Sequence, residues 1–286
     1  MKLLTNFINY QKSRFPLFLI IPTTFSAMLG TSVLFSEADI KTIALGTILS
    51  VAFLFHIRVI DEVRDFTHDQ RFHSYRPLHQ GLIKLSELKT LRIISLGLFF
   101  AISFYFSLET FICAIVLFVY SSFAARDFFI SAKIRKYFFV YNFLNMLQLI
   151  GLQMILYIAL GWDFKLGGII AAHLLIIFLL SLLLEMIRKI KLPVSEGEAK
   201  DTYSHHLGFH GSLTALVLTS IATLVPLYFI LNSLTVIVPS FFVFVLVTIL
   251  SFIHSKRKSD RTEKALFLGT LVYYLTINIT IFISLS

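Results

Sequence analysis

The chain has 286 residues, of which 57% are hydrophobic and only 14% are charged, and its formal net charge is +9. This balance excludes a water-soluble globule, because the apolar surface is larger than a soluble core of this size could bury. The single cysteine, Cys113, excludes an intrachain disulfide and a cysteine-based zinc or iron–sulfur centre. Composition alone therefore indicates an integral membrane protein.

The predicted elements begin with residues 1–15, which are too polar for the apolar core of a signal peptide. We expect them to form an amphipathic cytoplasmic segment on the membrane surface. Nine apolar runs follow, and we predict that each is a transmembrane helix. They lie near residues 16–36, 42–61, 90–108, 110–125, 137–160, 166–187, 211–231, 234–254 and 264–284. The sequence thus predicts an all-α membrane protein in which residues 1–286 form a single domain, a bundle of nine transmembrane helices.

The positive charges are distributed unevenly between the two ends of these helices. All but Lys41 and Lys165 of the 25 Lys and Arg residues fall on the N-terminal segment or on alternate connections. The positive-inside rule then predicts a cytoplasmic N-terminus and an outside C-terminus, in the inner membrane if the cell is bacterial. The connections 62–89 and 188–210 become cytoplasmic. We interpret the basic clusters 133–136 and 256–258 as contacts with anionic lipid rather than with nucleic acid.

Four acidic residues stand at the end of the second apolar run, in the stretch DEVRDFTHD at 61–69. Asp61, Asp65 and Asp69 are spaced i, i+4, i+8, so they share one face if the helix continues. Like charges on one face repel, and a positive group must offset them. One interpretation is ion pairing with the nearby arginines. The other is a Mg²⁺ ion held by the acids, with arginines binding the oxygens of a phosphate ligand. The arginines concerned are Arg58, Arg64, Arg71 and Arg76.

The connection that follows carries turn residues. Arg76-Pro77-Leu78 and Gly81 predict a chain reversal, because proline fixes φ and glycine allows a left-handed backbone. Ser86 is predicted to cap the next helix.

Together these residues resemble a known motif. Asp61-Glu62-x-x-Asp65-x-x-x-Asp69, followed by Arg76-Pro77-Leu78-x-x-Gly81, is similar to the first aspartate-rich motif of the UbiA superfamily of intramembrane prenyltransferases. The family usually has Asn and Asp where this chain has Asp61 and Glu62, and both replacements keep an oxygen ligand. Nine helices with a cytoplasmic N-terminus also fit that family.

The resemblance implies a Mg²⁺-dependent transferase. Such an enzyme ionises a prenyl diphosphate in a helix bundle open to lipid and passes the prenyl group to an aromatic or other lipophilic acceptor. The resemblance assigns metal binding to Asp61, Glu62, Asp65 and Asp69, and diphosphate binding to Arg58, Arg71 and Arg76.

A second acidic motif of the family falls on residues 185–208, where this chain departs from the pattern. Glu185 stands at the first acidic position, but Lys189, beside Arg188, stands at the next. We infer that Arg188 or Lys189 supplies positive charge to a diphosphate in place of a second Mg²⁺, with Glu185 as ligand or orienting group. The alternative is a helix-stabilising i, i+4 pair between Glu185 and Lys189. Further acids follow at Glu196, Glu198 and Asp201.

The fifth apolar run contains a row of polar side chains. Tyr141 and Asn142 are candidates for diphosphate contact, although an interface anchor and a hydrogen bond between helices are the commoner roles of such residues. His56 and His173 are candidate bases, and each more often bonds a backbone carbonyl.

Two other functions compete with prenyl transfer. An intramembrane terpene cyclase of the same fold would use the same diphosphate chemistry without an acceptor. A transporter is disfavoured, because transporter sites lie near the midplane on broken helices, whereas the acids here are at a helix end.

Overall fold

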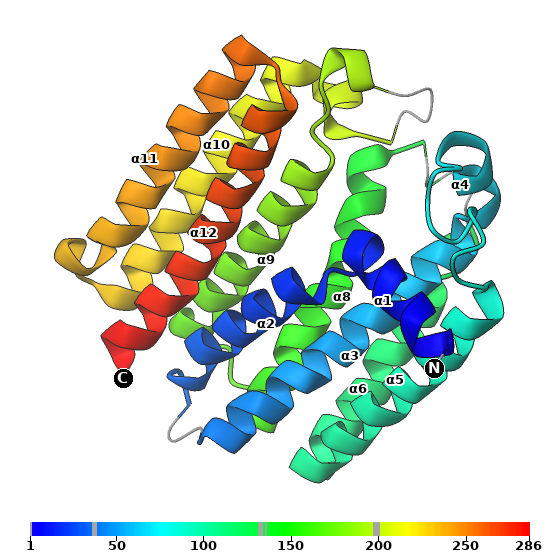
Figure 1. The fold of residues 1–286 in the computed structure, drawn as a ribbon. Helices are drawn as coiled ribbons and strands as arrows, with labels where there is room; N and C mark the ends of the chain where they lie inside the picture. The colour runs from blue at the N-terminus through cyan, green and yellow to red at the C-terminus, as the bar shows by residue number, and fades with distance from the viewer. Residues whose placement is uncertain (1, 36–38, 131–133, 135, 197–200) are drawn as a thin grey trace. The chain divides into compact units, whose positions relative to one another are not determined.

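The structure is a computed structural model that describes residues 2–35, 39–130, 134, 136–196 and 201–286. Helices are the only regular elements in this part of the chain, which confirms the predicted all-α class. In chain order they are α1 (Lys2–Arg14), α2 (Leu17–Ser32), α3 (Ile40–Arg64), α4 (Phe66–Phe72), α5 (Leu85–Phe106), α6 (Leu108–Ala124), η1 (Asp127–Phe129), α8 (Phe138–Ala159), α9 (Gly168–Arg188), η2 (Pro193–Ser195), α10 (Tyr203–Leu231), α11 (Leu234–Arg257) and α12 (Asp260–Leu285) (Figure 1).

Each of the nine predicted apolar runs coincides with a helix, although not all are long enough to cross a membrane. Within the described ranges, seven helices have the required length and composition. An eighth span exists if Thr5–Arg14 and Leu17–Ser32, bent by 65°, count as one. The fourth run became α6, which has 17 residues. The chain is therefore a multi-pass integral membrane protein, and the count of nine stays a prediction.

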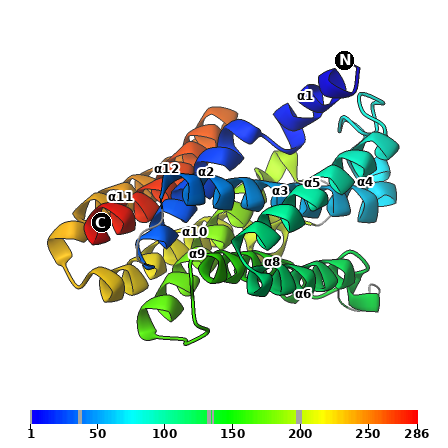
Figure 2. The same cartoon turned by 90° about the horizontal axis from the view of Figure 1, so that it is seen from below.

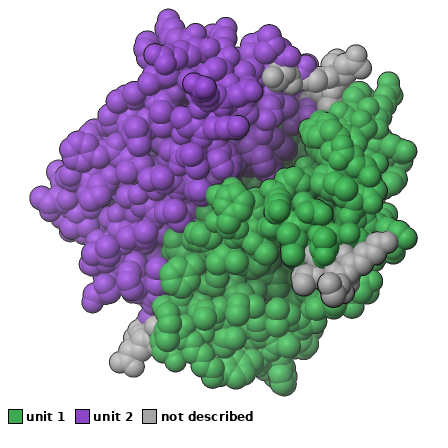
Figure 3. Space-filling view, in the orientation of Figure 1, with its two compact units in different colours: residues 1–28, 38–161 green, residues 29–37, 162–286 purple. Residues whose placement is uncertain are grey.

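The chain divides into two compact units (Figure 3). The first comprises residues 1–28 and 38–161, and the second comprises residues 29–37 and 162–286. In the first unit α3 packs against α5, α5 against α6, and α6 against α8. In the second unit α10 packs against α9 and α11, and α11 lies alongside α12 (Figures 1 and 2). The predicted single domain stays a prediction.

A buried cluster in the first unit holds the N-terminal helix and the 73–84 connection against α3. Phe15 and Phe55 meet edge to face, with ring centroids 5.1 Å apart. Leu78 and Ile83 of the connection are buried in the same cluster. Because these apolar side chains leave water together, the cluster fixes the chain segments that surround the end of α3.

The start of α5 differs from its prediction. The helix begins at Leu85, so Ser86 lies inside it and is not the cap. The carboxylate of Glu87 instead accepts a hydrogen bond from the backbone N–H of Lys84, with Oε2 and N 2.8 Å apart. The side-chain amide of Asn6 on α1 also contacts this carboxylate, 3.2 Å away. An N-terminal glutamate thus satisfies a free helix N–H and binds the neighbouring helix at once.

Candidate functional site

The predicted acidic residues lie where α3 passes into α4. Asp65 ends α3 and precedes α4, with φ −95° and ψ 11°. Its N–H donates to the carbonyl of Asp61 at 2.9 Å, and the N–H of Asp69 donates to the carbonyl of Asp65 at 2.8 Å. Helical hydrogen bonding therefore crosses the junction, and the i, i+4 spacing is kept.

One arginine bridges the first two aspartates. Nη2 of Arg64 lies 2.7 Å from Oδ1 of Asp61 and 3.2 Å from Oδ2 of Asp65. The Arg64 side chain is 10% exposed, whereas the Asp61 and Asp65 side chains are 32% and 26% exposed. The two carboxylates are therefore close enough for one cation to neutralise both, and both are open to solvent or ligand.

A third carboxylate, Asp127, joins them from the turn after α6. It is buried, and its Oδ1 lies 3.7 Å from Nε of Arg64. The hydroxyl of Tyr141 donates to the same oxygen at 3.1 Å. We call Asp61, Arg64, Asp65, Asp127 and Tyr141 the Arg64 cluster. Asp127 was not among the residues predicted from the sequence, where its one signal is an acid in an otherwise basic connection.

The backbone that presents Asp127 is unusual. Asp127, Phe128 and Phe129 all have positive φ, between 48° and 61°. Left-handed conformations cost non-glycine residues about 1–2 kcal/mol each. Such strain persists where the surrounding structure determines it, and it concentrates at functional sites.

Glu62 and Arg58 belong to a different group. Oε1 of Glu62, which is buried, lies 2.6 Å from Nη2 of Arg58 and 2.9 Å from Nε of Arg14 on α1. The hydroxyl of Tyr10 is a third, longer contact at 3.4 Å. Glu62 thus ties α1 to α3, and none of its recorded contacts is with the Arg64 cluster.

Asp69 lies in a third group, one helical turn beyond Asp65. Its buried carboxylate forms an ion pair with Arg76, and its Oδ1 lies 3.6 Å from Nδ1 of His68. His73 completes this group, since one ligand atom from each of His68, Asp69 and His73 lies within 4.8 Å of the others. The guanidinium of Arg71 lies over the ring of Phe72, 5.0 Å from its centroid.

In the second unit, Glu185 forms ion pairs with Lys189 and Arg188, the two cations that the sequence places near it. Nζ of Lys189 lies 2.8 Å from Oε1, and Arg188 pairs with Oε2. The helix ends here, and the carbonyl of Lys189 accepts the N–H of Tyr203 at 3.0 Å. Of the later acids, Glu196 accepts a hydrogen bond from Thr202, and Glu198 lies outside the described residues.

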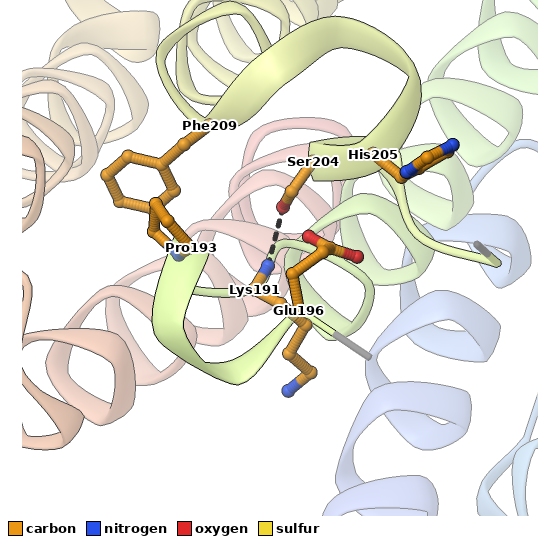
Figure 4. Close-up of a pocket in the computed structure, with 6 residues that line it drawn as sticks. All are labelled: Lys191, Pro193, Glu196, Ser204, His205 and Phe209. Atoms are coloured by element: carbon orange, nitrogen blue, oxygen red, sulfur yellow. Dashed lines mark hydrogen bonds between the residues drawn. The ribbon is translucent and has the colours of Figure 1, made fainter. Parts of the chain in front are cut away.

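The connection that follows forms a pocket of about 270 Å³ (Figure 4). The backbone N–H of Lys191 donates to Oγ of Ser204 at 2.6 Å, which closes this connection on itself. Gly208 then breaks α10, with φ 71° and ψ 160°. The pocket is lined by Lys191, Pro193, Glu196, Ser204, His205 and Phe209.

The polar residues inside the helices are mostly bonded locally. The amide of Asn142 donates to the carbonyl of Phe138 at 2.8 Å within α8.

His56 bonds side chains of other helices rather than a backbone carbonyl. Nε of Arg92 donates to its Nδ1, and its Nε2 lies 3.0 Å from Oγ of Ser121. With Nδ1 accepting, Nε2 carries the proton, so His56 is not poised as a base.

The donor set of the Arg64 cluster suits Mg²⁺. Mg²⁺ prefers oxygen ligands and is commonly held by one or two carboxylates together with phosphate oxygens and water. Arg64 shows that a single positive centre reaches Asp61 and Asp65 together. The residues present therefore fit the metal that the sequence resemblance implies.

The fold is shared with solved structures of other proteins. No protein-family model and no curated protein matches the sequence. In structure, the chain is similar to a digeranylgeranylglyceryl phosphate synthase, with a TM-score of 0.61, 16% identity and coverage of 100% of this chain and 99% of that chain. It is also similar to a UbiA homolog from Aeropyrum pernix K1, with a TM-score of 0.63, 13% identity and coverage of 93% and 97%. A UbiA homolog from Archaeoglobus fulgidus bound to DMAPP and Mg²⁺ gives a TM-score of 0.55, 13% identity and coverage of 95% and 98%. The predicted UbiA-type helical fold is thereby confirmed.

Proposed function

We propose that this chain is a Mg²⁺-dependent intramembrane prenyltransferase that ionises a prenyl diphosphate and transfers the prenyl group to an aromatic or other lipophilic acceptor. The observation that carries the proposal is the Arg64 cluster, in which three carboxylates converge on one cation at the end of an apolar helix. Support comes from the fold, which a UbiA homolog bound to DMAPP and Mg²⁺ shares.

Asp61 and Asp65 would hold the metal, with Asp127 as a third negative charge that Tyr141 orients. Mg²⁺, when bound, would neutralise the leaving diphosphate. Asp69 and Glu185 stay predicted ligands. Glu62 is better assigned to anchoring α1, because its carboxylate contacts Arg14 and Arg58 instead.

The chain's cations would bind the remaining phosphate oxygens. Guanidinium groups present paired N–H donors that match phosphate oxygens, which suits Arg71 and Arg76. Diphosphate binding by Arg188 or Lys189, one of which stands at an acidic position of the second motif, stays a prediction from the sequence.

The reaction separates charge in an apolar setting. The allylic C–O bond breaks, and its electron pair leaves with the diphosphate. The acceptor then donates an electron pair to the allylic carbon and releases a proton. The long apolar helices exclude water, which protects the allylic cation from hydrolysis.

The proposal is tested by binding a non-hydrolysable prenyl diphosphate analogue to purified protein with and without Mg²⁺. We expect binding to require Mg²⁺ and to weaken about 10-fold or more in Asp65→Asn, because a contact with a charged group is worth about 1.5–3 kcal/mol. The control is Asp163→Asn, an exposed carboxylate whose pKa is lowered by the hydrogen-bonded ammonium of Lys165, so that it too is charged.

The proposal would be contradicted if Asp65→Asn and Asp163→Asn both bound the analogue equally well with and without Mg²⁺. It would also be contradicted if the protein bound no analogue of any prenyl chain length. Incubation with a hydrolysable donor then separates two reactions. A product that forms only with acceptor indicates transfer, and a cyclic product without acceptor indicates a terpene cyclase.

A further inference from the structure

The helix α4 and the residue after it bring two imidazoles to a buried carboxylate. His68 and Asp69 lie on α4, and His73 ends it. Asp69 and His73 are spaced i, i+4, and the N–H of His73 donates to the carbonyl of Asp69 at 2.8 Å. One ligand atom from each of the three side chains lies within 4.8 Å of the others.

The distance between His68 and Asp69 fits a shared ion better than a direct bond. Nδ1 of His68 and Oδ1 of Asp69 are 3.6 Å apart, which exceeds the length of a hydrogen bond between nitrogen and oxygen. Two ligand atoms bound tetrahedrally to Zn²⁺, each at about 2.1 Å, lie about 3.4 Å apart. The two groups are thus already near the separation that a common metal would impose.

Neighbouring side chains hold these groups in place. Arg76 binds Oδ2 of Asp69, so Oδ1 stays turned toward His68. The ring of His68 packs on Phe72 with centroids 4.9 Å apart. Metal-binding carboxylates and imidazoles are usually oriented by such outer contacts.

We propose that His68, Asp69 and His73 form a binding site for a transition metal ion, Zn²⁺ being the natural occupant. Two imidazole nitrogens and one carboxylate oxygen favour Zn²⁺ and its first-row neighbours over Mg²⁺, which prefers oxygen ligands. Three protein ligands leave at least one position open. The positive charge of Arg76 beside the metal makes water or an anionic oxygen the fitting fourth ligand. The inference gives Asp69 to this ion instead of to Mg²⁺, and the site does not otherwise depend on the proposed transfer reaction.

The site is tested with Co²⁺ as a visible probe for Zn²⁺. Purified metal-free protein in detergent is titrated with Co²⁺, and the visible absorption of the bound ion is recorded before and after Zn²⁺ is added. We expect one saturable Co²⁺ site per chain, displaced by Zn²⁺ and not by Mg²⁺. His68→Ala and His73→Ala should each weaken Co²⁺ binding about 10-fold or more, since even outer-shell changes cost about 10- to 100-fold in metal affinity.

Matched variants separate this site from the other acids and histidines. His79→Ala changes a histidine of the same connection whose ring packs on Phe66, and it should bind Co²⁺ like the wild type. Asp61→Asn should also keep Co²⁺ binding, although it would lose Mg²⁺-dependent binding of a diphosphate analogue if the proposed function is correct. Each variant is compared by its thermal unfolding, and His73→Gln replaces His73→Ala if that variant does not fold.

Two outcomes would overturn the inference. One is Co²⁺ binding that survives in both His68→Ala and His73→Ala, which would place the ion elsewhere. The other is the failure of folded wild-type protein to bind Co²⁺ or Zn²⁺ at a stoichiometric level.

Discussion

Arg64 decides the charge balance of the candidate site. Asp61, Asp65 and Asp127 all lie within 4 Å of its guanidinium, so that one cation faces three carboxylates. Three carboxylates around one arginine carry a net negative charge. One guanidinium cannot offset three carboxylates, so the cluster still attracts a further cation.

Removal of this arginine should make the protein depend on added metal. We expect Arg64→Ala to unfold at a lower temperature in chelator, by an amount that corresponds to about 2 kcal/mol, because three carboxylates then repel without compensation. Addition of Mg²⁺ should raise the unfolding temperature of Arg64→Ala more than that of the wild type. The measurement is thermal unfolding in detergent with and without Mg²⁺.

Arg71→Ala is the control for this prediction, because Arg71 is an exposed arginine that contacts a phenylalanine ring in the same stretch. Equal Mg²⁺ effects on the wild type and on Arg64→Ala would show that the cluster does not take up Mg²⁺ when Arg64 is gone.

At this scale the sequence predicted contacts that helical spacing determines. The i, i+4 spacing correctly brought Asp61 and Asp65 together, and it anticipated the pairing of Glu185 with Lys189. It did not anticipate Asp127, because that carboxylate arrives from another part of the chain on a left-handed turn that no local pattern indicates. The partner of Glu62 on α1 was missed for the same reason.

Among the elements, α10 contains a break that only glycine satisfies well. Gly208 has φ 71° and ψ 160°, a region almost closed to other residues, although nothing lies within 4 Å of an added Cβ. The break separates the short turn that carries Ser204 from the long apolar part of α10. It therefore controls how the second connection returns to the helix.

We expect Gly208→Ala to destabilise the protein by about 1–3 kcal/mol through backbone strain alone. The matched variant is Gly211→Ala, three residues further on, where the backbone is helical and the nearest atom is 3.5 Å away. Alanine should stabilise the helix there by about 0.5–1 kcal/mol. Thermal unfolding of both variants checks the pair, and an unchanged stability of Gly208→Ala would contradict the predicted strain.

The helices themselves were predictable, because long apolar runs specify membrane helices with few alternatives. The residues at which the helices begin and end were harder to predict. The start of α5 depends on Glu87, which bonds a backbone N–H and a side chain of α1, and the sequence suggested Ser86 instead. The bend of 65° between Thr5–Arg14 and Leu17–Ser32 falls at Phe15 and Pro16, and only the packed structure reveals that Phe15 is buried there.

For the whole molecule, the distribution of lysine and arginine led to a proposed orientation, with the N-terminus cytoplasmic and residue 286 outside. The protein offers a direct test, because Cys113 is its only cysteine. In a Cys113→Ser background, Ser286→Cys should react with a membrane-impermeant maleimide on intact cells. Ser13→Cys, at an exposed position of α1, should react only after the membrane is opened.

Labelling of both cysteines from the same side would mean an even number of spans. It would then favour the eight spans that the described helices allow over the nine predicted from the sequence. The assignment of the overall fold does not rest on this count, because it comes from the similarity to solved structures at 13–16% identity.

Because Arg64 is part of the chain, it competes with every free cation for the same two carboxylates. Groups joined by a short tether meet at an effective concentration of about a millimolar. We therefore expect trace divalent ions to leave the guanidinium in place, and Mg²⁺ at about millimolar levels to exchange with it. A guanidinium released in this way can bind an anion. Binding of the metal and binding of the anion would then be coupled, each favouring the other.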